Sequence, residues 1–232
     1  MGHVAGEECR PSEFLIACLS NVYVKEAATG TIRSIAHAGD EAPGGDEYRQ
    51  AFNPVINDQG NIVFLGDLTP PPAARRVTWV FLHSAGETIL VAGPGDEMPG
   101  GGHFATASNI AGWQLHMNNA GEIVFNATLD TATLRNDTGD PIPDTGLYVW
   151  SHGSLRLVAR TGTVIPGVGT IAGLRMNVLR VAPPPVFVPN SGAHSNDRGQ
   201  VVFGASLIEN DEHGEQRGVL LVATPKSQKR DD

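Results

Sequence analysis

The sequence has little of what several functional classes require. Only 2 of its 232 residues are cysteine and 18% are charged, and no apolar run approaches the roughly 20 residues of a membrane-spanning helix. Lys and Arg number 16 against 25 Asp and Glu, which gives a net charge of −9. Nucleic-acid binders need clustered basic residues to displace counterions from phosphates. We therefore expect no nucleic-acid partner and no membrane span.

The cysteines and the N-terminus leave the cellular compartment open. Cys9 and Cys18 could pair in an oxidising compartment, and their distance from the repeated motifs described below argues against a catalytic cysteine. Glu7 and Glu8 precede the apolar stretch FLIACL (14–19) in place of a basic region, so no signal peptide is visible in this chain. Either the chain is cytoplasmic, or its true start has been removed or replaced.

Turn-forming residues, by contrast, are abundant. The chain holds 28 Gly and 16 Pro, and no convincing amphipathic helix interrupts its short apolar runs. This composition favours many short strands.

One phrase occurs three times, as NDQGNIVF (57–64), NNAGEIVF (118–125) and NDRGQVVF (196–203). We call these the asparagine phrases. Other segments repeat in register with them: AGDEAPGG (38–45), PGDEMPGG (94–101) and TGTVIPGV (161–168), each preceded by two short apolar runs that a turn joins. Such internal repetition indicates a repeat architecture.

The repeat divides the chain into an N-terminal segment (1–19), a single repeat domain (20–224) and a polar tail (225–232). Three units span about 20–70, 78–130 and 145–209, and GVLLVAT (218–224) is a fourth copy of the opening strand. Because that strand lacks its own following strands, we expect it to pair back onto another unit and close a ring.

The expected fold is all-β, with three blade-like antiparallel units in a β-propeller-like or otherwise pseudo-threefold arrangement. Propellers have four to eight blades, so three units are too few for a closed one. The chain could be an arc of a larger ring, two chains could complete a ring as a homodimer, or three sheets could pack as a prism.

The repeats resemble the NxxGxxxF tandem repeat of bacterial surface or secreted proteins of the choice-of-anchor type. The asparagine phrases match the NxxGxxxF element, and AGDEAPGG and PGDEMPGG match its Gly-Asp-x-x-Pro-Gly element, so that the resemblance covers about 20–224. It implies an extracellular or cell-surface location. It implies no activity.

The asparagine phrases support two interpretations. Turn chemistry alone explains Asn57, Asn118 and Asn196, because Asn side chains bond the backbone two residues on and the following Gly supplies a positive φ. Alternatively, pseudo-symmetry gathers the three asparagines on one rim as ligand-binding residues, with Asp58 and Asp197 as oxygen ligands for Ca²⁺.

Asp40 and Asp96 are further candidate calcium ligands in the Gly-Asp-x-x-Pro-Gly segments. Unit three has Thr163 at this position, so a threefold metal ring there is disfavoured. Acidic turn residues are also commonly just solvated.

Two histidines occupy equivalent positions. His116 and His194 each lie two residues before a repeated Asn, where unit one has Val55. They could face a shared axis and act as catalytic bases or metal ligands, or they could be ordinary residues at strand ends.

Two functions follow from these patterns. The first is a non-enzymatic repeat module of an exported or surface protein, calcium-stabilised, that binds a small molecule, glycan or protein. The second is a calcium-dependent hydrolase of propeller type, acting on a lactone or ester through His116 and His194.

Overall fold

The computed structural model describes residues 4–7, 10–12, 15–69, 77–107, 115–135, 138–174, 193–208 and 216–225. Within these ranges the chain forms strands and turns and no helix, and every strand pair is antiparallel. The predicted all-β class is confirmed. No helix in these ranges is long and apolar enough to cross a membrane.

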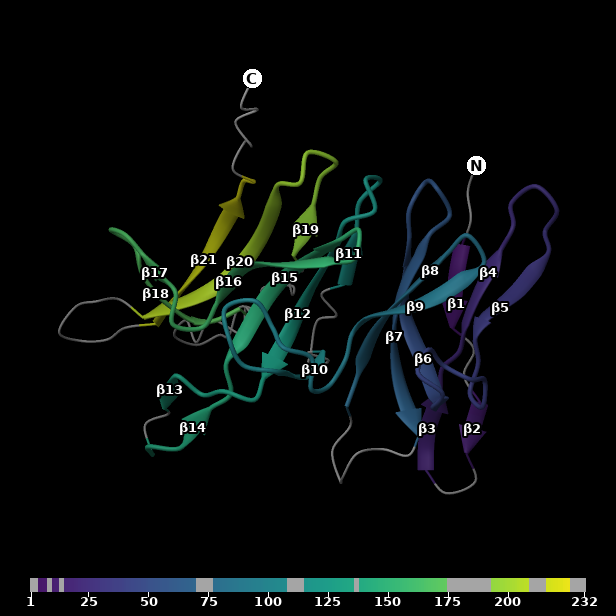
Figure 1. Ribbon diagram of the computed structural model, residues 1–232, viewed down its shortest axis with the longest axis horizontal. Coiled ribbons are helices and arrows are strands. Elements are labelled where there is room, and N and C mark those ends of the chain that lie inside the picture. Colours follow the sequence, from purple (N-terminus) through teal and green to yellow (C-terminus); the bar gives the residue numbers. More distant parts are fainter. Residues whose placement is uncertain are drawn as a thin grey trace, which may run out of the picture.

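Four sheets follow one another in chain order across the molecule (Figure 1). The first contains β1 (Val4–Glu7), β4 (Val22–Lys25) and β5 (Ile32–Ala36); the second contains β6 (Glu47–Ile56), β7 (Ile62–Thr69), β8 (Trp79–Ser84) and β9 (Glu87–Ala92). The third contains β10 (Phe104–Ala107), β11 (Leu115–Met117), β12 (Ile123–Leu129), β15 (Thr145–Ser151) and β16 (Ser154–Arg160). The fourth contains β17 (Val164–Ile165), β18 (Gly169–Gly173), β19 (His194–Ser195), β20 (Val201–Ile208) and β21 (Gln216–Ala223). Two small hairpins stand apart: β2 (Arg10–Ser12) with β3 (Leu15–Leu19), and β13 (Leu134–Arg135) with β14 (Pro141–Ile142).

The sheets are offset from the repeat seen in the sequence. The strand after each asparagine phrase pairs with the opening strand of the next unit, as β7 does with β8 and β12 does with β15. β21 likewise pairs with β20 and thereby extends the fourth sheet. None of the sheets closes on itself in the described part of the chain, and ring closure by this strand stays a prediction.

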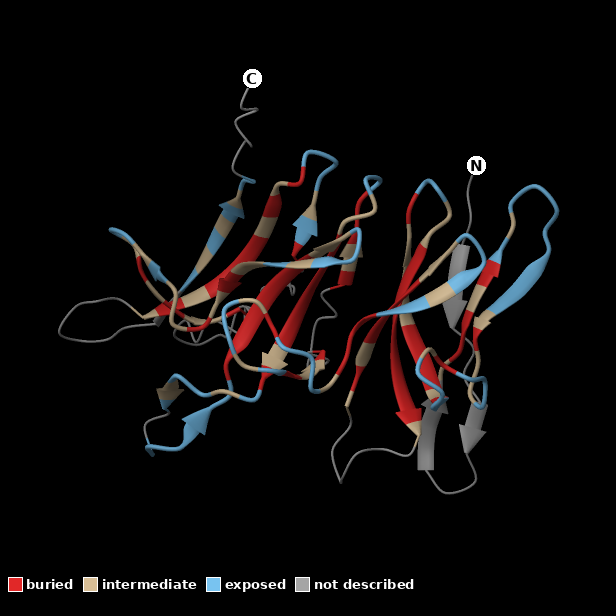
Figure 2. Cartoon of the chain, viewed as in Figure 1, coloured by how far each residue is buried: buried red, intermediate tan, exposed pale blue. Residues whose placement is uncertain are grey.

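Each inner sheet buries both of its faces, because it packs against a sheet on either side. On β7, Ile62 and Phe64 contact the core shared with the first sheet, while Val63 and Leu65 contact the core shared with the third. Strands buried on both faces are apolar at successive positions. This explains the IVF run of the repeated phrase, and Figure 2 shows the continuous burial along β7 and β12.

Three apolar cores therefore lie between four sheets. Aromatic rings fill the first two, with Phe64 and Phe81 stacked at 5.5 Å in one and Phe125 and Tyr148 at 6.0 Å in the other. The third core joins the third and fourth sheets around Phe203. Aromatic pairs of this kind stabilise packing beyond the area that they bury.

Several sequence predictions concern residues outside this description. Cys9 is not among the described residues, and the side chain of Cys18 is not described either. The proline-rich segment APPPVFVPNSG (182–192), expected to cover a pocket or bind a partner, and the acidic segment ENDEHGE (209–215), similar to calcium loops in composition, also lie outside the described ranges.

Candidate functional site

The three asparagine phrases form tight turns in a row along one rim of the stacked sheets. The turns connect β6 to β7, β11 to β12, and β19 to β20. In each turn the glycine N–H donates to the asparagine carbonyl, and the φ angles of Gly60, Gly121 and Gly199 are 82°, 77° and 71°. Only glycine adopts such angles without strain, so the turn requires the glycine of the phrase.

Hydrogen bonds join each turn to the next. The Asn57 side-chain Nδ2 donates to the Asn118 carbonyl at 3.3 Å, and Asn118 Nδ2 donates to the Asn196 carbonyl at 2.8 Å. Both donors are buried, which excludes water as a competing partner. The first asparagine of the phrase thus fastens its own sheet to the following one. We call this row of bonds the asparagine ladder.

The same asparagines also cap their own turns. Asn57 Oδ1 accepts the N–H groups of Gln59 and Asn61 at 3.2 and 3.0 Å, and Asn118 Oδ1 accepts that of Glu122 at 2.9 Å. One side chain therefore uses its carbonyl within the turn and its amide between turns. An ionised aspartate, which has no donor, could supply only the first of these bonds.

The second residue of each phrase extends the ladder. Asp58 N–H donates to Asn119 Oδ1 at 3.0 Å, Asn119 Nδ2 donates to Asp58 Oδ2 at 2.8 Å, and Asn119 N–H donates to Asp197 Oδ1 at 2.9 Å. The predicted metal ligands Asp58 and Asp197 therefore lie on either side of Asn119. Each uses one carboxylate oxygen in the ladder and stays exposed to solvent.

Asp40 and Asp96 lie at the opposite ends of their strands from the asparagine turns. Asp40 Oδ2 accepts the His37 N–H at 3.0 Å, and Asp96 Oδ2 accepts the Gly93 N–H at 2.7 Å. Thr163 Oγ1 accepts the Arg160 N–H in the third unit at 3.3 Å. Threonine can replace aspartate there because the position needs a backbone cap. Among the described residues no group of three or more His, Cys, Asp or Glu is placed to hold a metal ion.

The structure brings His116 and His194 together. Their rings lie on β11 and β19 with centroids 5.0 Å apart, in an edge-to-face arrangement. His116 Nδ1 accepts the backbone N–H of Ser195 at 3.2 Å, and the Ser195 Oγ lies 3.2 Å from the same nitrogen. Burial, with a smaller contribution from the charge of His194, lowers the pKa of His116 below 6.5.

This cluster has the elements of base-assisted chemistry. A neutral imidazole within hydrogen-bond distance of a serine hydroxyl is the pairing of base and nucleophile that hydrolases use, and here the same Nδ1 also accepts the Ser195 N–H. The same contacts also serve a structural purpose, since they hold β11 of the third sheet beside β19 of the fourth. Unit one has Val55 in the equivalent place, on β6.

A groove lies beside the ladder, between the third and fourth sheets. It has a volume of about 900 Å³, and its apolar wall includes Leu157, Val158 and Ala223. A smaller groove of about 310 Å³ lies between the second and third sheets. The grooves occupy equivalent positions, because the asparagine turns of adjacent sheets contribute to both and His152 borders each of them.

Among the described residues, the acidic side chains that line the larger groove form hydrogen bonds and the arginine side chains do not. Glu122 Oε2 accepts the Asn118 Nδ2 at 2.8 Å, and Asp197 accepts the Asn119 N–H. The exposed guanidinium groups of Arg156 and Arg198 make no hydrogen bond or ion pair with any described residue. The groove therefore presents two guanidinium groups without a partner among the described residues, beside an apolar wall and two carboxylates.

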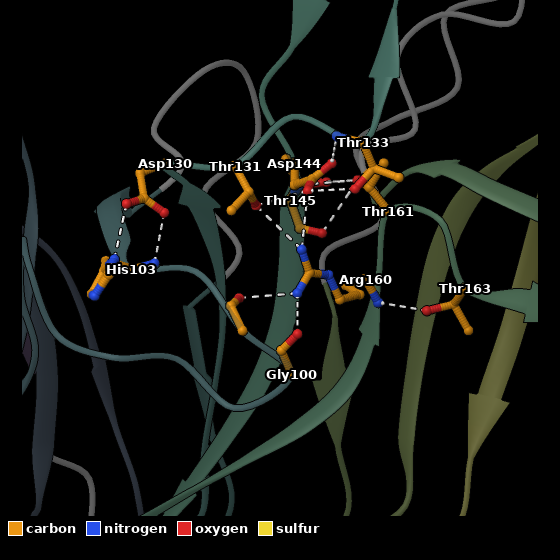
Figure 3. Close-up of polar contacts among 11 residues, drawn as sticks. Gly100, His103, Asp130, Thr131, Thr133, Asp144, Thr145, Arg160, Thr161 and Thr163 are labelled. Atoms are coloured by element: carbon orange, nitrogen blue, oxygen red, sulfur yellow. Dashed lines mark hydrogen bonds and ion pairs between the residues drawn. The ribbon is translucent and has the colours of Figure 1, made fainter.

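A second polar cluster lies at the opposite end of β15. Asp144 is fully buried and accepts hydrogen bonds from the hydroxyls of Thr131 and Thr133, each at 2.8 Å (Figure 3). Arg160 Nη2 lies 3.0 Å from Asp144 Oδ2, and its Nη1 donates to the carbonyls of Gly100 and Gly101.

These bonds give the second cluster a structural purpose. Burial opposes ionisation of Asp144, but the hydrogen bonds from Thr133, Thr131 and Arg160 outweigh it and lower the pKa of the carboxyl. The charge pair then fixes the Gly-Pro loop of the second unit against β16. Figure 3 also shows His103 donating to Asp130 at the neighbouring surface, with a Nδ1 to Oδ2 distance of 2.9 Å.

Sequence reasoning missed several residues of the rim. Ser195 directly follows His194, and its repeat equivalent in unit two is Met117, so comparison of the units would have marked it. Arg156 lies in no repeated motif and Arg198 at a variable position of the asparagine phrase, so only the packing of the third sheet against the fourth places them in one groove.

The asparagine ladder predicts unequal effects of one substitution at two equivalent positions. Asn57→Asp removes a buried donor to the next sheet and places a carboxylate beside the Asn118 carbonyl, so we expect a loss of about 1–3 kcal/mol. Asn196→Asp is the matched control. Its exposed Nδ2 donates only to Gln200, so a change of about 0.5 kcal/mol or less is expected. Urea denaturation measures both, and equal losses would contradict the ladder.

The histidine cluster predicts a pH-dependent stability. Because the folded-state pKa of His116 is lowered, the unfolded chain binds the proton more readily, and stability is lost as the pH falls below 6.5. The free energy of unfolding should therefore fall between about pH 7.5 and pH 5. His116→Gln should reduce this slope, since the glutamine oxygen accepts the Ser195 N–H without titrating. His152→Gln, at an exposed position, is the control, and an unchanged slope in His116→Gln would refute the assignment.

The sequence matches a protein-family model. No curated protein matches the chain. The sequence model of a family of unknown function (DUF7453) matches residues 17–230, a range that contains all three asparagine turns, the histidine pair and both grooves. The chain therefore belongs to DUF7453.

Proposed function

We propose that this chain is a non-enzymatic β-repeat module that binds a partner in the groove between its third and fourth sheets. The observation that carries the proposal is the groove itself, in which Arg156 and Arg198 have no partner among the described residues. The conspicuous polar residues of the repeat, by contrast, are used in holding the sheets together.

The stacking of the sheets supports a propeller-like arrangement. Successive sheets turn the same pair of faces toward their neighbours, as the blades of a propeller do. We propose on this basis that the chain forms an arc of a propeller. The resemblance to NxxGxxxF repeat proteins supports an exported or cell-surface location for the module, and this location is likewise a proposal.

The chemistry of the groove favours a carboxylated glycan as its ligand. A guanidinium group binds a carboxylate through two parallel hydrogen bonds, and two such groups suit a ligand with regularly spaced carboxylates. The apolar wall of Leu157 and Val158 provides a surface for the flat faces of sugar rings. Glu122 and Asp197 also line this groove, and their carboxylates accept hydrogen bonds from the neighbouring asparagine turn.

A pair of polygalacturonate oligosaccharides tests this function. We expect titration calorimetry to detect binding of the carboxylated form and not of its methyl-esterified form, which has the same backbone without the charges. The double variant Arg156→Gln with Arg198→Gln should lose about tenfold or more in affinity. Arg135→Gln, on the separate β13, is the matched control. Equal binding of both oligosaccharides, or of neither, would overturn the proposal.

A hydrolase is the second candidate, and the cluster of His116, His194 and Ser195 favours it. In that function His116 would take the proton of the Ser195 hydroxyl, which lies 3.2 Å away, while the oxygen attacks an ester or lactone carbonyl. Calcium could add to either function. Asp58 and Asp197 each retain a carboxylate oxygen that bonds to no described residue.

One assay separates the two candidates. The module proposal predicts no turnover of a panel of esters and lactones, with or without EDTA. Turnover that disappears in both His116→Ala and Ser195→Ala would replace the module with a hydrolase. A loss of that turnover with EDTA would make the hydrolase calcium-dependent. A lower melting temperature in EDTA, restored by added Ca²⁺, would support a structural calcium instead.

A further inference from the structure

The repeat allows the same surface to be compared on three sheets. Pairing registers align β7, β12 and β20, so that Val63, Val124 and Val202 occupy equivalent positions. On the neighbouring strands the equivalent residues are Val80, Leu147 and Leu220, and then Leu82, Val149 and Val222. In each sheet these three residues lie on the face that points toward the following sheet.

That face is buried in the second and third sheets and exposed in the fourth. Val80 and Leu82 are 0% and 7% exposed, and Leu147 and Val149 are each 1% exposed, because the following sheet covers them. Leu220 and Val222 are each 65% exposed. Figure 2 shows the contrast between the exposed β21 and the buried β12 and β15. The fourth sheet thus has the kind of surface that packs against a following sheet elsewhere in the chain, and no described sheet covers it.

The first sheet has the complementary property. β4 and β5 share a bulge with the later hairpins, placed between Val22 and Tyr23, which aligns Tyr23 with Phe81 and Tyr148. Those two rings pack against the preceding sheet. Ile32 aligns with Leu155, which also packs toward the preceding sheet, yet Ile32 is 65% exposed. The outer face of the first sheet thus offers Tyr23 and Ile32 at positions that pack toward a preceding sheet elsewhere, with the exposed Lys25 and Ser34 beside them.

We propose that a second copy of this chain stacks the outer face of its first sheet on the bare face of the fourth sheet, around Leu220 and Val222. The contact repeats the three sheet-to-sheet interfaces that already exist within the chain. Because the described residues include one face with no following sheet upon it and one with no preceding sheet upon it, a second copy supplies the matching surface. A head-to-tail contact of this kind closes a ring if the rotation allows it.

This assembly goes beyond the ligand function and stands independently of it. The groove that holds Arg156 and Arg198 lies between the third and fourth sheets, within one copy. Loss of ligand binding therefore leaves the proposed assembly intact, and a monomeric protein could still bind a carboxylated glycan.

Sedimentation equilibrium of the full chain tests the assembly. We expect the wild-type mass to exceed the 24.5 kDa of one copy by a factor of two or more at micromolar concentrations. Val222→Glu places a charge in the contact and should return the mass to that of a monomer, with unchanged circular dichroism because the position is exposed. Ile142→Glu, at an exposed apolar residue on β14, should leave the mass unchanged. A monomeric wild type, including one whose own chain covers the face, would overturn the proposal.

A mixing experiment tests which faces meet. Ile32→Glu should also give monomers, because it alters the opposite face. Mixing the Ile32→Glu and Val222→Glu variants restores one intact contact, since each supplies the face that the other lacks. We expect a dimer in the mixture alone. If Ile32→Glu instead dimerises by itself while Val222→Glu does not, two copies of the fourth-sheet face meet each other, and the head-to-tail contact is wrong.

Discussion

The arrangement of the sheets depends on a hydrogen bond from the side-chain amide of the first asparagine in the repeated phrase. In the first two phrases it donates from the turn of one sheet to the backbone of the next turn, at Asn57 and Asn118. Apolar packing between sheets is non-directional and tolerates sliding. A hydrogen bond at a fixed point on each turn sets the position of one sheet against its neighbour. The rim, with its grooves and its histidine pair, is the consequence of that alignment.

The inner sheets are buried on both faces, and this determines both the repeated apolar sequence of their strands and the exposed apolar face of the fourth sheet. An inner strand such as β7 must be apolar at successive positions, which is what IVF supplies. In the described part of the chain, the first and fourth sheets each pack against one neighbouring sheet. Leu220 and Val222 are exposed for that reason, and the repeat itself indicates what kind of surface would cover them.

Local sequence signals predicted the strands and turns well, because they depend on neighbouring residues. Asn57 and Gly60 indicate a turn wherever they stand in a chain. The offset between sequence units and sheets was not predictable in this way, since it depends on which hairpin β7 and β12 select as partner. The joint use of Asn118 in capping and in bridging also needed the structure. Symmetry did indicate that His116 and His194 would meet, while Arg156 and Arg198 are united only by tertiary packing.

Hydrogen exchange of the asparagine side-chain amides, followed by NMR, tests the central claim most directly. Asn57 and Asn118, both buried, each donate from Nδ2 to the backbone of the next turn, whereas the Nδ2 of the exposed Asn196 donates, among the described residues, to Gln200 of its own turn. We predict that the first two exchange at least about tenfold more slowly than the third, because their exchange requires adjacent sheets to separate. Equal exchange at all three asparagines would show that these side chains do not fasten the sheets together.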